Sequence, residues 1–138
     1  MANHWLLKTE PSAYSFDRLT NEGRAVWDGV RNSLALQHLR AMKAGDRVLI
    51  YHTGAEKSVV GTGHVVKASY PDPTQADARL VVVDIEADAR LARPVALATI
   101  KADPALAGMP LIRMPRLSVM PVEPEQWKRI LSLGQGKD

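Results

Sequence analysis

Six consecutive residues, Trp27 to Asn32, place an indole, a carboxylate, a glycine, a guanidinium and a carboxamide in one short stretch. An apolar aromatic wall beside hydrogen-bond donors and acceptors suits a pocket for a flat polar ring, above all a nucleobase. Large aromatic side chains more often fill cores than pockets, so periodicity alone favours Trp27 as a core anchor. The stacking-wall interpretation stays open beside it, whereas Trp5 and Trp127 are expected in the core.

The residue types that support catalysis lack the spacing of a reaction centre. The four histidines form no H-E-x-x-H or comparable metal-binding pattern, and no G-x-S-x-G motif is present. Gly61-Thr62-Gly63 lacks the third glycine and the Lys-Ser/Thr pair of a phosphate loop, so we expect a sheet bend there. We therefore predict no catalytic residue, no metal and no cofactor. His52, at the end of a predicted strand, is either a satisfied surface imidazole or a ligand contact.

The positive charge of the chain is concentrated around the Trp27 segment. The sequence has 18 Lys and Arg against 15 Asp and Glu, a net charge of +3. Positions 24 to 47 contain five cationic residues and two acidic ones, namely Arg24, Arg31, Arg40, Lys43 and Arg47 against Asp28 and Asp46. This segment carries the whole net charge of +3, so the rest of the chain is neutral. This distribution is compatible with a polyanionic partner, and Arg24, Arg40 and Lys43 are candidate contacts to a nucleic-acid backbone. For Arg40 and Lys43, complementing the negative end of a helix is an equally good explanation.

Short strands and a few helices are expected to position these residues. The patterns predict strands at 4–9, 46–52, 58–68, 80–86 and 116–120, and helices at 16–19, from 33 to a stop at Gly45, in short turns within 94–108, and at 124–134. Asn32 or Ser33 should cap the second helix, which puts the Trp27 segment at its positive end. Two prolines make 70–73 a rigid loop. The result is a small α+β domain around a curled or closed sheet.

Length and composition favour one domain over residues 1–138. The chain has no cysteine, no leader-like segment and no apolar run of membrane-spanning length. We expect a cytoplasmic protein that makes no membrane contact, with a monomer favoured.

Seven short motifs, taken in order, are similar to those of the EVE domain family along nearly the whole chain. They are Lys8-Thr9-Glu10-Pro11, Trp27-Asp28-Gly29-Val30-Arg31-Asn32, Lys43-Ala44-Gly45-Asp46, Tyr51-His52-Thr53, Tyr70-Pro71-Asp72-Pro73-Thr74-Gln75, Pro94-Val95 and Arg116-Leu117-Ser118-Val119. The resemblance implies a PUA-like pseudobarrel of mixed, mostly antiparallel strands flanked by helices. Its wider superfamily includes YTH domains and other readers of RNA and modified bases.

The resemblance also implies a pocket for a modified base, with 5-methylcytosine derivatives favoured in DNA by some members. Trp27 would form one wall, and the other residues would line or brace the pocket. The implied ligand-binding residues are Trp27, Asp28, Arg31, Asn32, His52, Thr53, Tyr70, Arg116 and Ser118.

Three positions depart from the family pattern. Many relatives have Tyr where this chain has Ser33, and Trp where it has Leu80. If that Trp is a second wall in relatives, this chain has a weaker aromatic box that rests mainly on Trp27. Thr9 replaces a more usual Ser and keeps the hydroxyl group.

The leading hypothesis is a non-catalytic domain that binds DNA or RNA and recognises an extruded, modified base. Single-stranded or damaged sites should bind best, because extrusion costs least there. One alternative is a nucleobase-processing enzyme with His52 as acid or base and Asp28 as its partner. Another is a small-molecule or nucleotide sensor, or an interaction module in which Trp27 belongs only to the core.

Overall fold

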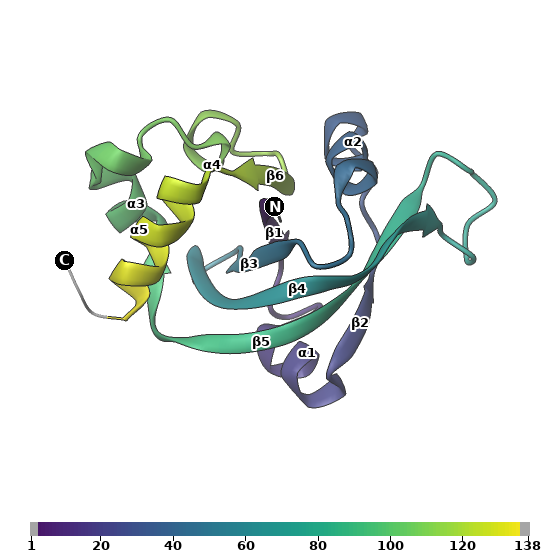
Figure 1. Ribbon diagram of the computed structural model, residues 1–138, viewed down its shortest axis with the longest axis horizontal. Helices are drawn as coiled ribbons and strands as arrows, with labels where there is room; N and C mark the ends of the chain where they lie inside the picture. The colour runs from purple at the N-terminus through teal and green to yellow at the C-terminus, as the bar shows by residue number, and fades with distance from the viewer. Residues whose placement is uncertain (1–2, 136–138) are drawn as a thin grey trace.

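One mixed sheet organises the part of the chain that the computed structural model describes, residues 3–135 (Figure 1). Its strands are β1 (His4–Thr9), β2 (Arg24–Trp27), β3 (Arg47–His52), β4 (Ser58–Pro71), β5 (Val81–Ala96) and β6 (Val119–Val122). They lie in the order β2-β5-β4-β3-β1-β6, and within these residues only the β1–β3 pair is parallel. The strands β2 and β6 are therefore the two edges.

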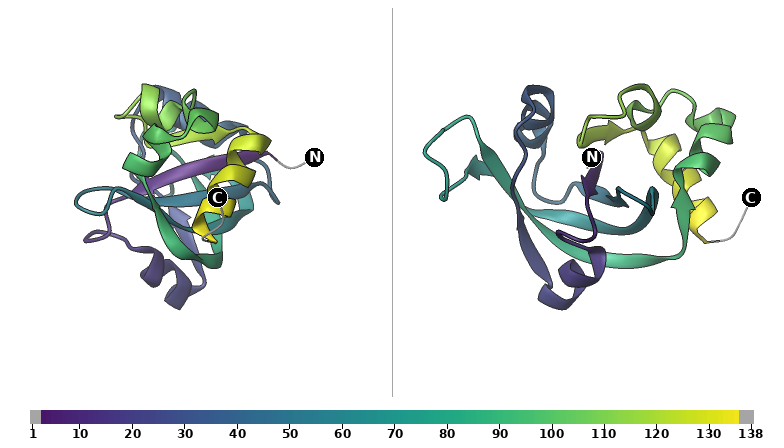
Figure 2. Two further views of the ribbon diagram at one scale, coloured as in Figure 1. Left: turned by 90° about the vertical axis from the view of Figure 1, so that its left-hand side faces the viewer. Right: turned by 180° about the vertical axis from the view of Figure 1, so that it is seen from behind.

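The helices lie around this sheet. They are α1 (Phe16–Glu22), α2 (Ser33–Ala41), α3 (Leu97–Ala102), the 3-10 helix η1 (Pro104–Leu106), α4 (Pro110–Arg113) and α5 (Pro124–Gly134). In two opposite views, α3, α4 and α5 gather at one end of the molecule, while the turn between β4 and β5 projects at the other (Figures 1 and 2). Within residues 3–135, no helix combines the length and apolar character needed to cross a membrane.

The long strands β4 and β5 bend where their register shifts. One shift lies between Val59 and Gly61, and the next between Thr62 and Gly63. A Cβ at Gly61 would lie 2.4 Å from the Cζ atom of Phe16, and one at Gly63 would lie 2.5 Å from the backbone oxygen of Glu86. Only glycine allows these approaches without displacing a neighbour, so the expected sheet bend is confirmed.

The core fills the interior of the bent sheet. Trp5 and Trp127 are buried as expected, with 5% and 4% of their surface exposed. The indole N–H of Trp5 donates to the buried carboxylate of Asp46 at 2.9 Å, and the guanidinium of Arg47 lies 4.9 Å from the Trp127 ring centroid. Both tryptophans therefore combine apolar packing with a polar or cationic neighbour.

Local signals place most elements correctly. Ser15 caps α1 through a hydrogen bond from the backbone N–H of Arg18, and Asn32 caps α2 through one from Ala35. The helix α1 runs three residues beyond the predicted end at Leu19, because the Gly23 N–H bonds back to the Leu19 carbonyl and closes it. The helix α2 ends at Ala41, earlier than expected, and buried Met42 is its C-cap.

Four expectations about strands and loops are corrected. The strand β2 is absent from the predicted strands, and Trp27 ends it because Trp27 pairs with Val83. Tyr70 lies at the end of β4, where it pairs with Val82, instead of in the predicted 70–73 loop.

The other two corrections concern β5 and β6. The strand β5 continues to Ala96, into the predicted helical stretch, because its last residues pair with the start of β4. The strand β6 begins at Val119 and contains Pro121, so Arg116 and Ser118 precede it. An edge strand tolerates proline because its outer face needs no ladder hydrogen bond.

Candidate functional site

A cavity of about 630 Å³ lies beside Trp27, at the opening of the bent sheet. We call it the Trp27 pocket, and its lining residues are Lys8, Thr9, Ala13, Tyr14, Arg18, Glu22, Arg24, Ala25, Val26, Trp27, Asp28, Gly29, Val30 and Ser118. Arg24 to Trp27 form one edge of the sheet, while Lys8 and Thr9 end β1 and Ser118 precedes the other edge. The pocket thus occupies the gap between the two edges. Its volume falls in the range of roughly 300–1,000 Å³ that is typical of small-molecule sites.

Two aromatic rings form a corner of the pocket. Tyr14 and Trp27 meet edge to face, with centroids 6.1 Å apart and planes at 89°. Trp27 exposes only 7% of its surface, so it is a core anchor whose exposed part reaches the cavity. Tyr14 is half-buried, and the Thr9 hydroxyl fixes it by donating to its backbone oxygen at 2.7 Å. The core-anchor and pocket-wall interpretations of Trp27 are therefore compatible.

The phenol of Tyr14 is held by a small polar cluster on α1. It donates to a Glu22 carboxylate oxygen at 2.6 Å, and Arg18 Nε donates to the other oxygen at 3.2 Å. The hydrogen bond from Tyr14 lowers the pKa of Glu22, and that from Arg18 adds to the effect. Burial and the same contact raise the pKa of Tyr14. Glu22 thus stays ionised and Tyr14 neutral near pH 7, which fixes the ring beside Trp27.

A second polar cluster orients Arg24 at the pocket rim. Arg24 Nη2 donates to Asp84 at 2.7 Å, and the Tyr70 hydroxyl donates to the other Asp84 oxygen at 2.5 Å. This bond to Asp84 raises the pKa of Tyr70 to about 12. Tyr70 does not line the Trp27 pocket, but it shares the acceptor that holds Arg24.

The two remaining charged residues of the pocket differ in their partners. Lys8 Nζ donates to the backbone oxygen of Pro115 at 2.8 Å, and partial burial lowers the pKa of Lys8. Asp28 is exposed and has no hydrogen-bond or ion-pair partner among residues 3–135. It follows Trp27 directly and precedes Gly29, whose φ of +77° forms a turn that suits glycine.

A second, basic cavity begins at Arg31, which directly follows the pocket residues Asp28, Gly29 and Val30. We call it the arginine hollow; its volume is about 270 Å³, and it is lined by Arg31, Ser33, Leu36, Gln37, Arg40, Asp77, Arg79 and Leu80. Arg40 Nη2 donates to the Arg79 backbone oxygen at 2.7 Å, which ties α2 to the β4–β5 turn. Arg79 also pairs with Asp77 at 2.8 Å. Three arginines against one aspartate leave this hollow positive.

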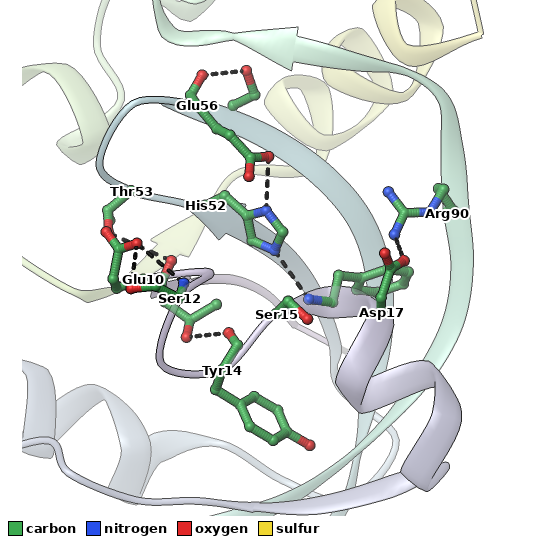
Figure 3. Close-up of polar contacts among 12 residues, drawn as sticks. Glu10, Ser12, Tyr14, Ser15, Asp17, His52, Thr53, Glu56 and Arg90 are labelled. Carbon is green, nitrogen blue, oxygen red and sulfur yellow. Dashed lines mark hydrogen bonds and ion pairs between the residues drawn. The ribbon is translucent and has the colours of Figure 1, made fainter.

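His52 and Thr53 lie outside both cavities and brace loops instead (Figure 3). His52 Nε2 accepts a hydrogen bond from the Phe16 N–H at 3.0 Å, and Nδ1 lies 3.0 Å from Glu56. A nitrogen that accepts carries no proton, so His52 is neutral and donates through Nδ1 to Glu56. The Thr53 hydroxyl lies 3.3 Å from Glu10 Oε2. Neither residue faces Asp28 across the Trp27 pocket.

The other predicted residues are spread over the surface. Asn32 and Arg116 border a third, more apolar cavity of about 500 Å³ that also includes exposed Met114. Lys43 lies beyond α2, where its backbone N–H donates to Asp46. The Trp27 pocket therefore brings together four of the predicted residues, Trp27, Asp28, Ser118 and Arg24, while Arg31 and Arg40 meet in the arginine hollow. Whether each contacts a ligand stays a prediction.

Several pocket residues have no strong sequence signal. Tyr14, Arg18 and Glu22 line the Trp27 pocket because the chain turns at Gly23 from α1 into β2. The clue was Ser15, whose capping position predicts a helix just before the basic segment.

The departures from the family pattern at Ser33 and Leu80 lie in the arginine hollow and not in the expected aromatic pocket beside Trp27. Both residues line the arginine hollow and neither lines the Trp27 pocket. An aromatic ring missing at Leu80 therefore removes no wall from the Trp27 pocket, where Tyr14 supplies a second ring. No group of three His, Asp or Glu side chains within residues 3–135 is arranged to hold a metal ion.

A bent, mostly antiparallel sheet with helices around it and a polar aromatic pocket at its opening defines an α+β protein of the PUA-like class. A crystal structure of ASCH from Zymomonas mobilis has a TM-score of 0.58 and 14% identity, covers 95% of each chain, and shows this fold alone. The chain belongs to the EVE domain family, whose model, described as "EVE domain", matches residues 3–133.

Similar proteins cover nearly the full chain. Mouse thymocyte nuclear protein 1 is 32% identical over 96% of this chain and 74% of its own length. The NMR structure of Rpa0253 from Rhodopseudomonas palustris is 43% identical, with a TM-score of 0.93, over 99% of this chain and 96% of that one. Human THYN1, solved in complex with 5-methylcytosine-containing DNA, is 27% identical, with a TM-score of 0.90, over 99% of this chain and 100% of that one.

Proposed function

We propose that this chain is a non-catalytic nucleic-acid-binding domain that accommodates one extruded, modified base in the Trp27 pocket. The observation that carries the proposal is the corner of Tyr14 and Trp27 within a cavity that also presents charged and hydroxyl groups. Flat apolar surfaces beside a few polar groups are what a nucleobase requires. The human relative in complex with 5-methylcytosine DNA favours a modified cytosine, with a modified RNA base as the alternative.

Base contacts alone leave little net affinity. Extruding a base costs a few kcal/mol, and stacking on an aromatic side chain returns about 1–3 kcal/mol. Contacts to phosphates must supply the remainder, and they depend on salt. The arginine hollow is suited to this role because it is lined by three arginines, and Arg31 directly follows Val30 of the Trp27 pocket. The proposal therefore assigns Arg31, Arg40 and Arg79 to the backbone, and single strands should bind best.

The placement of His52 supports a binding role over catalysis. Both ring nitrogens are engaged by Phe16 and Glu56, and only 5% of the residue is exposed. A general acid or base must reach the proton that it transfers. His52 does not line the Trp27 pocket to which Asp28 belongs, so the pairing that the enzyme alternative requires has no geometric support there.

The test is a titration of fluorescent single-stranded oligonucleotides, each with one 5-methylcytosine or one cytosine, and of RNA counterparts, at two salt concentrations. We expect preference for a modified oligonucleotide and weaker binding in Trp27→Ala and Tyr14→Ala. Tyr14→Ala is included because Trp27→Ala removes a buried ring, at about 3–5 kcal/mol of stability. Binding of no oligonucleotide, or binding that neither change weakens, would overturn the proposal. Equal affinity for free 5-methylcytidine would instead favour a small-molecule sensor.

The phosphate contacts are tested separately. Arg31→Ala and Arg79→Ala should weaken modified and unmodified strands alike. Each lost phosphate contact should reduce the slope of log affinity against log salt by about 0.7. Arg93→Ala is the matched control, because Arg93 is exposed on β5 and lines neither cavity.

A further inference from the structure

Asp28 differs from every other charged residue that lines the Trp27 pocket. Lys8 donates to Pro115, Arg24 to Asp84, and Arg18 to Glu22, which also accepts from Tyr14. Asp28 alone of these has no hydrogen-bond or ion-pair partner within residues 3–135. Its acceptor oxygens are therefore free to bind an incoming group.

A free carboxylate is unfavourable at a site that binds a polyanion unless it serves recognition. It repels phosphates, and an ionised carboxylate only accepts hydrogen bonds. A base can offset this cost only if it presents a donor. Cytosine and adenine carry an exocyclic amino group, whereas thymine and uracil carry a carbonyl oxygen at the corresponding position. Asp28 would attract the exocyclic amine of the first pair and repel the carbonyl oxygen of the second.

We propose that Asp28 accepts a hydrogen bond from the exocyclic amine of the bound base, so that the pocket selects amino-bearing bases over keto-bearing ones. The inference rests on the function proposed above and names the base class within it. Asp28 follows Trp27 directly in the sequence and lines the same cavity. A base packed into the Tyr14–Trp27 corner would present one polar edge to it.

A comparison of two bases tests the contact between Asp28 and the exocyclic amine. A 5-methylcytosine and a thymine both carry a 5-methyl group and differ at position 4, an amine in one and a carbonyl in the other, and in the protonation of N3. In otherwise identical single strands, the unaltered protein should bind the 5-methylcytosine strand roughly tenfold more tightly, as expected for a hydrogen bond to a charged group. Equal binding of the two strands would overturn the inference.

Asp28→Asn provides the second arm, because a carboxamide can turn its NH₂ group toward the thymine carbonyl. In this variant, the ratio of the affinities for the 5-methylcytosine strand and the thymine strand should fall to near one or reverse. Asp28 is exposed, so the variant should fold. Glu125→Gln, on the outer surface of α5, is the control for losing one negative charge and should keep the preference. An unchanged preference in Asp28→Asn would refute the role of Asp28.

The two proposals fail in different ways. If both strands bind equally and Tyr14→Ala weakens both, the base pocket stands and the inference about Asp28 is wrong. If neither strand binds, both proposals are overturned.

Discussion

Tyr14 meets Trp27 edge to face, with ring centroids 6.1 Å apart, although the two residues are thirteen positions apart in the sequence. The contact joins the segment after β1 to the last residue of β2, one of the two edge strands of the sheet. Tyr14 is fixed by Thr9 at its backbone and by Glu22 at its hydroxyl. The aromatic corner is thus built before any ligand arrives, which reduces the ordering cost of binding.

Tyr14 should contribute to binding through its ring more than through its hydroxyl. Tyr14→Ala removes the ring, and we expect a loss of about tenfold in affinity for a strand with 5-methylcytosine, within the range for base–aromatic contacts. Tyr14→Phe keeps the ring and frees Glu22, so its affinity should stay close to that of the unaltered protein. Fluorescence anisotropy measures both. Equal losses in the two variants would show that the hydroxyl group carries the effect.

Gly61 should be intolerant of a side chain. A Cβ there would lie 2.4 Å from the ring of Phe16, which is buried. Gly61→Ala is expected to cost about 1–3 kcal/mol of unfolding free energy, because the ring or the β4 backbone must move. Urea denaturation measures this cost. Gly108→Ala is the control, since nothing lies within 4 Å of its added Cβ, and a similar loss in both variants would refute the steric explanation.

His52 should matter for stability and not for chemistry. His52→Ala leaves the buried Phe16 N–H without its acceptor, so we expect a loss of about 1–3 kcal/mol in unfolding free energy. At a temperature where the variant is folded, its affinity for the modified strand should be unchanged. Mass spectrometry of the strand after incubation should show no product with either protein. A product that disappears in His52→Ala would support the enzyme alternative instead.

Asp103 gives the fold a pH dependence in the acid range. The hydrogen bond from Arg129, at 2.6 Å, and one from the Ala105 N–H hold the pKa of Asp103 below its ordinary value of 3.8. A lowered folded-state pKa stabilises the fold above 3.8, and this stabilisation is lost as pH falls through the folded-state value.

Asp103→Asn tests this dependence. The unaltered protein should have a higher Tm than the variant at about pH 6, and the difference should shrink toward about pH 2. Asparagine can still accept from Ala105, so the cap of η1 is retained. Glu125→Gln is the control, because its partner Lys128 lies 3.8 Å away and both side chains are exposed. A Tm difference for Asp103→Asn that does not change with pH would contradict the linkage.

Local signals in the sequence are sufficient to predict most of the helices and strands. Ser15 and Asn32 cap helices as predicted, and the glycines at 61 and 63 mark the sheet bend. The ends of strands are harder to predict, because pairing with a distant strand can extend a strand beyond its local pattern. Tyr70 belongs to β4 because Val82 lies opposite, and no local pattern shows that partner.

The lining of the Trp27 pocket could be predicted only in part, because it also depends on contacts between distant segments. The composition of 27–32 predicts Trp27, Asp28 and Arg31 as ligand contacts; Trp27 and Asp28 line the Trp27 pocket, whereas Arg31 lines a different cavity. Asp28, Gly29 and Val30 line one cavity and Arg31 lines the other, which spacing along the sequence does not reveal. Tyr14 was missed because its proximity to Trp27 depends on how α1 packs against β2.

The most direct test of the account maps binding residue by residue. In ¹H–¹⁵N NMR spectra, a short strand with one 5-methylcytosine should shift the signals of Tyr14, Trp27, Asp28 and Gly29, including the Trp27 indole N–H. An otherwise identical strand with an abasic site should shift the signals around Arg31, Arg40 and Arg79 but leave those of the Trp27 pocket in place. Unchanged signals from Trp27 and Tyr14 at saturating 5-methylcytosine strand would contradict the assignment of this pocket to the base.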